Sequence, residues 1–202
     1  MKKRLCLIIS IFLIGINLVY AKEKVAFVKC VDGDTFRVMI DEEEKLVRML
    51  AIDTPEIAKN GKRAEYYAEE ASNYTCDKIT KAKKIELEYD SNSDKTDKYG
   101  RVLAWVYVDG KLLQDDLVAD GYAKVAYLYA DYKYTDILKE KQELASAKEI
   151  GIWDSEAKKE YDDSEIVDGN TIEEASNGIV VIVGIIILGM VFIFDKIFNK
   201  KK

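Results

Sequence analysis

The chain has 202 residues, no histidine and only three cysteines, and its 31 basic and 37 acidic side chains give a net charge of −6. The length predicts one globular domain with room for appendages. The composition excludes histidine-dependent nucleases, Ser-His-Asp hydrolases, zinc sites with histidine or four cysteine ligands, and scaffolds of several disulfides.

The N-terminal 21 residues have the pattern of a secretory signal peptide. Lys2, Lys3 and Arg4 precede an apolar run, and Val19-Tyr20-Ala21 offers a cleavage site. The alternative is an anchor that stays uncleaved.

Residues 22–153 have the pattern of a small barrel with helices. Strands are predicted from alternation and from β-branched or aromatic residues. They lie near 24–31, 35–41, 45–52, 84–89 and 102–108. Helices are predicted over 63–81, over 112–120 with Gly121 at its end, and over 134–150 with Thr135 as N-cap and Gly151 closing it. This order predicts a mainly β fold with α: a five-stranded Greek-key barrel of the OB type plus three helices.

The rest of the chain predicts a membrane tether. Residues 154–177 hold nine acidic residues and two lysines, which is typical of a solvated acidic linker. Residues 178–194 are uncharged and predict a short transmembrane helix, with a buried core helix as the alternative. The basic tail 195–202 is then cytoplasmic. The protein is expected to span the cell membrane once, with residues 22–177 outside.

The charge of the predicted domain restricts its partners. Residues 22–153 carry 22 basic and 27 acidic side chains, a net charge of −5. A polyanion would be repelled by such a domain unless a local cluster of cations or a bound metal attracts it.

Oxygen-bearing side chains stand at the predicted ends of neighbouring strands. Asp32-Gly33-Asp34 forms the turn between the first two strands, a pattern that alone is common in hairpins. Asp53, Thr54 and Glu56 follow the end of the third predicted strand. Ca²⁺ binds carboxylate and carbonyl oxygens at about 2.3–2.6 Å. Asp34, Asp53 and the Thr54 carbonyl group therefore predict a site for a hard cation.

Two further segments bring cations and aromatic rings together. Residues 97–101, Asp-Lys-Tyr-Gly-Arg, form a turn into the fifth strand. Tyr127 and Tyr129 stand two residues apart, so they can share one face of an extended segment. Arg48 alternates with core residues of the third strand and can point at the cation site.

Together these segments resemble the Ca²⁺-dependent thermonuclease family of staphylococcal nuclease. The resemblance runs from about residue 25 to Trp153 with similar order and spacing. Its motifs are Asp32-Gly33-Asp34-Thr35, Asp53-Thr54-Pro55-Glu56, Thr96-Asp97-Lys98-Tyr99-Gly100-Arg101, Ala123-Lys124-Val125-Ala126-Tyr127 and Gly151-Ile152-Trp153.

The resemblance implies a role for each matching residue. Asp34 and Asp53 would be the carboxylate ligands of Ca²⁺, Thr54 would add its carbonyl oxygen, and Asp32 would lie near the ion. Glu56 would hold and deprotonate the attacking water. Arg48 and Arg101 would grip the scissile phosphate, and four residues would bind the neighbouring nucleotide: Lys98, Tyr99, Tyr127 and Tyr129.

The expected function is Ca²⁺-dependent hydrolysis of DNA and RNA with little sequence preference, and the resemblance implies products with 3′-phosphate ends. No obligate protein partner is inferred. The alternatives are a non-catalytic nucleic-acid-binding module at the cell surface and a Ca²⁺-dependent surface adhesin. Cys30 and Cys76 fall on a predicted strand and a predicted helix with no sign of proximity, so free thiols are favoured over a disulfide.

Overall fold

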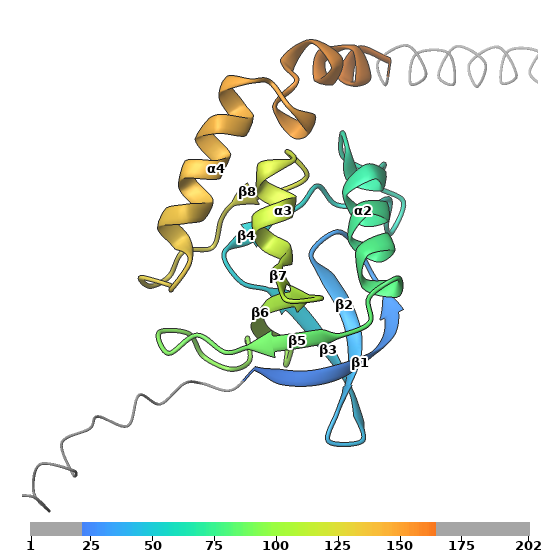
Figure 1. Ribbon diagram of the computed structural model, residues 1–202. Coiled ribbons are helices and arrows are strands. Elements are labelled where there is room, and N and C mark those ends of the chain that lie inside the picture. The colour runs from blue at the N-terminus through green and yellow to red at the C-terminus, as the bar shows by residue number, and fades with distance from the viewer. Residues whose placement is uncertain (1–21, 165–202) are drawn as a thin grey trace, which may run out of the picture. The chain divides into compact units, whose positions relative to one another are not determined.

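Five strands close into a barrel in the computed structural model, which describes residues 22–164 (Figure 1). The strands are β1 (Glu23–Cys30), β2 (Thr35–Ile40), β3 (Glu43–Met49), β5 (Ile85–Glu88) and β6 (Val102–Val108). The pairs β1–β2, β2–β3, β1–β5 and β5–β6 are antiparallel, and a parallel pairing of β3 with β6 closes the barrel. This arrangement confirms the predicted mainly β barrel of the OB type with helices.

Three two-residue strands were not predicted: β4 (Ile52–Asp53), β7 (Lys111–Leu112) and β8 (Lys124–Val125). The predicted strand 45–52 was too long, because the chain turns at Ala51, where φ is 61°. Met49 and Leu50 donate their backbone N–H groups to the carbonyl oxygens of Asp34 and Ala104 before the turn. β4 then pairs with β8 in a separate sheet, and this pair carries Asp53.

The three predicted helices are present and shorter: α2 (Ala68–Thr80), α3 (Leu113–Ala119) and α4 (Thr135–Ala147). A 3₁₀ helix, η1, covers Gly151–Trp153. The predicted N-cap of α4 was wrong, because Thr135 is its first helical residue and Tyr134 holds the cap position without a side-chain hydrogen bond. Gly151 does not close α4, which ends at Ala147, but begins η1.

Alternating strand side chains fill the barrel. Phe36, Val38, Val47, Leu87 and Trp105 have no exposed surface. Burial of an apolar side chain of this size contributes about 1.5–3 kcal/mol. The barrel is therefore a rigid support for the residues at its strand ends.

A buried amide connects α3 to the central strand β6. Gln114 accepts a hydrogen bond from the backbone N–H of Val106 and donates one to the carbonyl oxygen of Ala104, each at 3.0 Å. These bonds satisfy main-chain groups that would be costly to bury alone.

Two glycines allow η1 to pack against the end of α3. Gly121 has φ 70°, and a Cβ atom there would lie 2.2 Å from the carbonyl oxygen of Ile150. Gly121→Ala is therefore expected to lower the free energy of unfolding by at least about 2 kcal/mol, through backbone strain and this clash. Urea denaturation measures the loss.

Gly110→Ala is the matched control for Gly121→Ala. Gly110 has φ 85°, and its added Cβ would meet no atom within 4 Å. It should therefore show the cost of strain alone, about 1 kcal/mol. Equal losses for the two variants would contradict the packing described for Gly121.

The predicted acidic linker begins as a helix over residues 155–164. Asp154 accepts a hydrogen bond from the N–H of Ala157 at 2.9 Å, as an N-cap does. The helix has no buried residue, so no apolar period marked it in the sequence. The predicted signal peptide (1–21), the rest of the linker, the transmembrane helix (178–194) and the tail (195–202) lie outside the described residues. Within residues 22–164, no helix has the length and apolar character needed to cross a bilayer.

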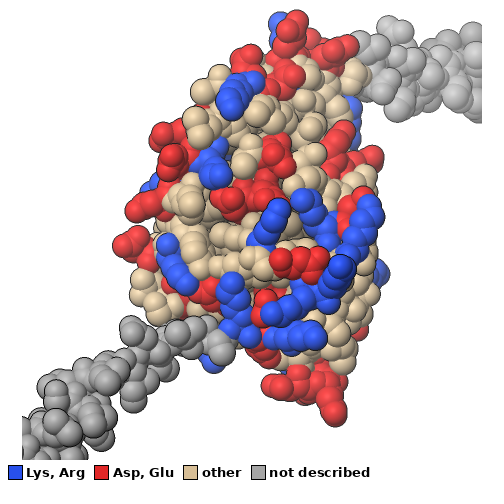
Figure 2. Space-filling model, viewed as in Figure 1, with Lys and Arg blue, Asp and Glu red and all other residues tan. Residues whose placement is uncertain are grey.

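Charge is unevenly spread over the molecule. Figure 2 shows lysine and arginine side chains gathered over the C-terminal half of α2 and the strands below it, while acidic side chains dominate other parts of the same face. The net charge of −5 for residues 22–153 therefore does not describe every part of the surface. A polyanion can approach such a domain locally.

Candidate active site

A buried carboxylate, Asp34, stands directly before β2. It is 4% exposed and accepts hydrogen bonds from the Thr35 hydroxyl group at 2.9 Å and from the backbone N–H of Thr54 at 3.1 Å. The β2–β3 register places Thr35 opposite Arg48, which brings the Arg48 guanidinium group next to Asp34. Strand pairing therefore assembles this cluster from distant parts of the sequence.

Arg48 links the two predicted metal ligands. Its Nη1 atom forms an ion pair with Oδ2 of Asp34, and its Nη2 atom donates to Oδ1 of Asp53 at 3.1 Å. Asp53 also pairs with Nζ of Lys124 at 3.1 Å, because β4 and β8 place the two residues opposite each other. The two carboxylates thus converge on one cationic group, and Lys124 is a neighbour that the sequence analysis did not assign.

The protonation of Asp34 is set by its burial. Burial raises the pKa of Asp34 to about 6, the charge of Arg48 opposes this rise, and the charge of Asp32 adds to it. The backbone N–H of Asp34 donates to the Asp32 carboxylate at 3.2 Å, so Asp32 lies beside the cluster. A cation near Asp34 would favour its charged form.

The donor atoms fit a hard cation. Among residues 22–164 no three or more acidic, cysteine or histidine side chains gather as a metal-binding group. The predicted ligands are instead two carboxylates and the main-chain carbonyl of Thr54, a buried residue tied to Asp34. Oxygen donors of this kind are the ones that Ca²⁺ prefers.

A groove of about 990 Å³ opens beside the carboxylates. Its walls come from the end of β3, the loop between β5 and β6, and the segment after β8. Seven of the predicted site residues line it: Arg48, Glu56, Lys98, Tyr99, Arg101, Tyr127 and Tyr129. The groove therefore brings together the predicted catalytic and nucleotide-binding side chains.

Arg101 is oriented by an acid that sequence reasoning missed. Its Nε atom donates to Oδ2 of Asp97 at 2.6 Å, and the N–H groups of Tyr99 and Arg101 both donate to Oδ1 at 2.9 Å. Burial would raise the pKa of Asp97, but these hydrogen bonds outweigh it and lower that pKa. In the sequence, this ion pair was indicated by the spacing of four residues between Asp97 and Arg101.

The three tyrosines predicted to bind the nucleotide are among the residues that line the groove. Tyr99 is 72% exposed, and its ring centre lies 5.0 Å from Nζ of Lys98 and 5.5 Å from Cζ of Arg101. The ring centres of Tyr127 and Tyr129 are 6.4 Å apart. These two rings lie together, as predicted, but on a tight turn, since Tyr127 has φ 55° and accepts a hydrogen bond from the N–H of Tyr129.

Glu56 is an exposed residue of the groove, on the segment that follows β4. Two hydrogen bonds to Glu65 hold its main chain: its N–H donates to Oε2 of Glu65 at 3.1 Å, and its carbonyl oxygen accepts from the Glu65 N–H at 2.9 Å. The segment that carries Glu56 is thereby fixed while its surroundings stay open to water.

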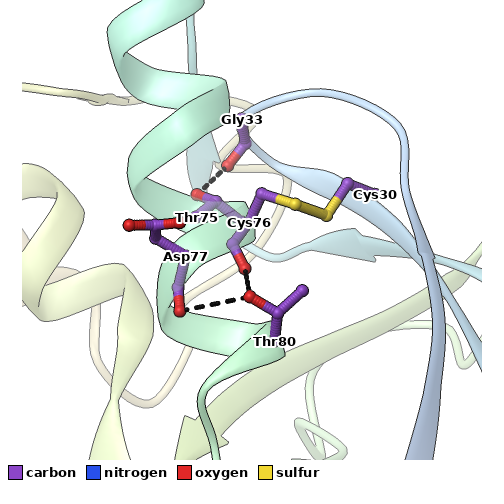
Figure 3. The surroundings of a disulfide bond; sticks show 6 residues. All are labelled: Cys30, Gly33, Thr75, Cys76, Asp77 and Thr80. Carbon is purple, nitrogen blue, oxygen red and sulfur yellow. Dashed lines mark hydrogen bonds between the residues drawn. A yellow bond between two sulfur atoms is a disulfide. The ribbon is translucent and has the colours of Figure 1, made fainter.

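The prediction of free thiols was wrong. Cys30 and Cys76 form a disulfide with a Cα–Cα distance of 5.7 Å (Figure 3). The barrel places the last residue of β1 beside α2, a proximity that strand and helix patterns do not encode. The available signal was that these are the only two cysteines outside the N-terminal run, in a domain expected to face an oxidising exterior.

The fold and the site define the class of protein. It is an OB-type barrel with a carboxylate pair at its strand ends and a groove lined by guanidinium and aromatic side chains. The family described as "Staphylococcal nuclease homologue" matches residues 46–155, more than half of the chain. The chain belongs to this family.

Several curated proteins are similar over the same region. The SPbeta prophage-derived endonuclease YokF of Bacillus subtilis is 41% identical over 126 residues, which are 62% of this chain and 42% of that protein. Endonuclease YncB of the same organism is 39% identical, over 62% of this chain and 59% of the relative. The thermonuclease of Staphylococcus hyicus is 32% identical, over 62% and 73%. The chain thus spans about half the length of the two Bacillus relatives.

Proposed function

We propose that the chain is a Ca²⁺-dependent phosphodiesterase that hydrolyses DNA and RNA with little sequence preference and leaves 3′-phosphate ends. The observation that carries this proposal is the convergence of Asp34 and Asp53 on one cationic group, at the edge of a groove that also holds Arg101 and Glu56. Membership of the family, with relatives named endonuclease and thermonuclease, supports it.

The proposed mechanism assigns the protein's charges to the reacting phosphate. Asp34, Asp53 and the Thr54 carbonyl would hold Ca²⁺, which neutralises charge on the phosphate when bound. Arg101, and Arg48 once the ion replaces it as the partner of Asp34 and Asp53, would meet phosphate oxygens with forked hydrogen bonds. Such bonds are strong because both partners are charged. Stabilisation of the charge that develops during attack is usually the largest catalytic contribution.

Glu56 acts as the general base in this proposal. A chain without histidine needs another base that works near neutral pH, and a carboxylate within reach of an ordered water can serve. The proton of the attacking water passes to the Glu56 carboxylate as the new P–O bond forms. The bond between phosphorus and the 5′ oxygen breaks, and that oxygen leaves with a proton taken from solvent water. Its exposed position in the groove leaves room for that water.

The tyrosines and Lys98 bind the nucleotide beside the scissile bond. Aromatic rings stack on any base, so they favour single-stranded or locally opened nucleic acid over a particular sequence. The charge of Lys98, next to Tyr99, attracts the adjoining phosphate.

Incubation of the purified full chain with DNA and RNA, single-stranded and duplex, tests this function. We expect hydrolysis in Ca²⁺, loss of hydrolysis in a chelator, and 3′-phosphates on the products. Binding without turnover would instead favour the non-catalytic nucleic-acid-binding module. Ca²⁺ binding without any nucleic-acid binding would favour the adhesin.

We also propose that the domain faces outward and is held at the cell membrane by residues 178–194. The Cys30–Cys76 disulfide supports an oxidising location, since disulfides are rare in the cytosol. Protease added to intact cells should release the domain from its acidic linker. A domain that resists protease until the cells are lysed would contradict this topology.

A further inference from the structure

Two adjacent residues of α2 are bonded to the turn that carries Asp32 and Asp34 (Figure 3). Cys76 forms the disulfide with Cys30, the last residue of β1, just before the turn. The hydroxyl group of Thr75, which is 1% exposed, donates to the carbonyl oxygen of Gly33 at 2.6 Å. The helix is therefore bonded to the chain at Cys30, just before the turn, and at Gly33, within the turn.

The other side of the turn is packed against Thr54. A Cβ atom on Gly33 would lie 2.7 Å from the Thr54 hydroxyl oxygen, and the Thr54 N–H donates to the Asp34 carboxylate at 3.1 Å. The turn is thus enclosed between α2 and the strand end that delivers Asp53 and Thr54. If α2 moved away, the turn would lose its contacts on one side and could change position.

We propose that the Cys30–Cys76 disulfide and Thr75 are positioning groups for metal binding by Asp34, and that opening the disulfide weakens the affinity for Ca²⁺. This inference rests on the proposed function, because it concerns the same metal-binding turn. None of the three residues contacts substrate or metal in the proposal. They act through the position of the Asp32–Asp34 turn.

The redox step is a thiol–disulfide exchange with a dithiol reductant. One thiolate of the reductant attacks a sulfur of the disulfide, the second closes the reductant into its own disulfide, and Cys30 and Cys76 each gain a proton. Two electrons pass from the reductant to the protein. The Thr75 hydrogen bond then remains between the turn and α2.

Ca²⁺ affinity depends on how rigidly the oxygen ligands are held. Loss of a group that orients a metal ligand typically costs about 10–100-fold in affinity. We therefore expect reduction to raise the half-saturating Ca²⁺ concentration by about tenfold. Turnover at saturating Ca²⁺ should change little, because Arg48, Arg101 and Glu56 are not linked to α2 by these bonds.

The test titrates Ca²⁺ into the full chain before and after reduction by dithiothreitol. Calorimetry follows binding, and nuclease assays over a range of Ca²⁺ concentrations separate half-saturation from maximal turnover. Circular dichroism in each state verifies that the domain stays folded at the assay temperature. A Cys30→Ala/Cys76→Ala variant is the control, since it should match the reduced chain and ignore the reductant.

A second comparison works on the oxidised chain, so it remains decisive if reduction unfolds the domain. Thr75→Val keeps the shape of the side chain and removes the hydrogen bond to Gly33, whereas Thr75→Ser keeps the bond. We expect Val to raise half-saturating Ca²⁺ and to speed hydrogen exchange of the amides of residues 31–35 in metal-free protein. Ser should resemble the unchanged chain.

The outcomes separate this inference from the proposed function. Equal Ca²⁺ affinities for oxidised and folded reduced chains, or for Thr75→Val and Thr75→Ser, would overturn the inference while leaving a Ca²⁺-dependent nuclease. An oxidised chain that neither binds Ca²⁺ nor hydrolyses nucleic acid would overturn both.

Discussion

Replacement of Glu56 by glutamine is expected to lower turnover by about 10²–10⁴-fold, the contribution typical of a positioned general base. This corresponds to roughly 3–5 kcal/mol of activation free energy. The amide keeps the size of the side chain and its place in the groove but cannot accept the proton of water. Because Glu56 is exposed, the free energy of unfolding should stay within about 0.5 kcal/mol.

Glu65→Gln is the matched control for Glu56→Gln. Glu65 lies in the same loop and accepts the backbone N–H of Glu56, and glutamine retains an acceptor oxygen for that bond. Single-turnover assays at saturating Ca²⁺ compare the two variants. Similar losses for both would indicate that the loop's shape or charge matters and would contradict a role of Glu56 as base.

Replacement of Arg101 by lysine should lower turnover by about 10²–10³-fold, as removal of one preorganised donor does. Lysine keeps the positive charge but loses the planar fork that matches phosphate oxygens. Arg101 is a better test than Arg48, which also neutralises Asp34 and Asp53. A buried carboxylate without its partner destabilises the fold by about 3–5 kcal/mol and would confuse the result.

Arg37→Lys supplies the comparison for Arg101→Lys. Arg37 forms an ion pair with Glu44 at 3.1 Å, their side chains are 41% and 46% exposed, and neither lines the groove. The exchange there should leave the rate unchanged. If Arg101→Lys retained more than about a third of the original turnover, a fork at this position would not be needed for the reaction.

The sequence predicted the barrel strands because the pattern that marks a strand lies within the strand itself. Period-two alternation marked the five barrel strands, helical spacing marked the first helix, and residues typical of helix ends marked the other two. The two-residue strands β4, β7 and β8 were missed, since they are too short for a period and depend on partners elsewhere in the chain. The helix at 155–164 was missed because it has no buried face.

The candidate site was predicted as a set of residues but not as a network. Asp34, Asp53 and Arg48 were expected together and do meet. The pairing of Asp97 with Arg101 and that of Lys124 with Asp53 depend on side-chain directions that the sequence does not contain. The disulfide was missed for a related reason, because only the closed barrel brings Cys30 to Cys76.

Direct calorimetric titration of Ca²⁺ into the full chain, the Asp34→Asn chain and the Asp53→Asn chain tests the central claim most directly. We predict one ion bound per unchanged chain and at least about a tenfold loss of affinity in each variant, since both carboxylates are needed. Binding of Ca²⁺ with equal affinity by all three chains would contradict the assignment of the metal to this pair of carboxylates.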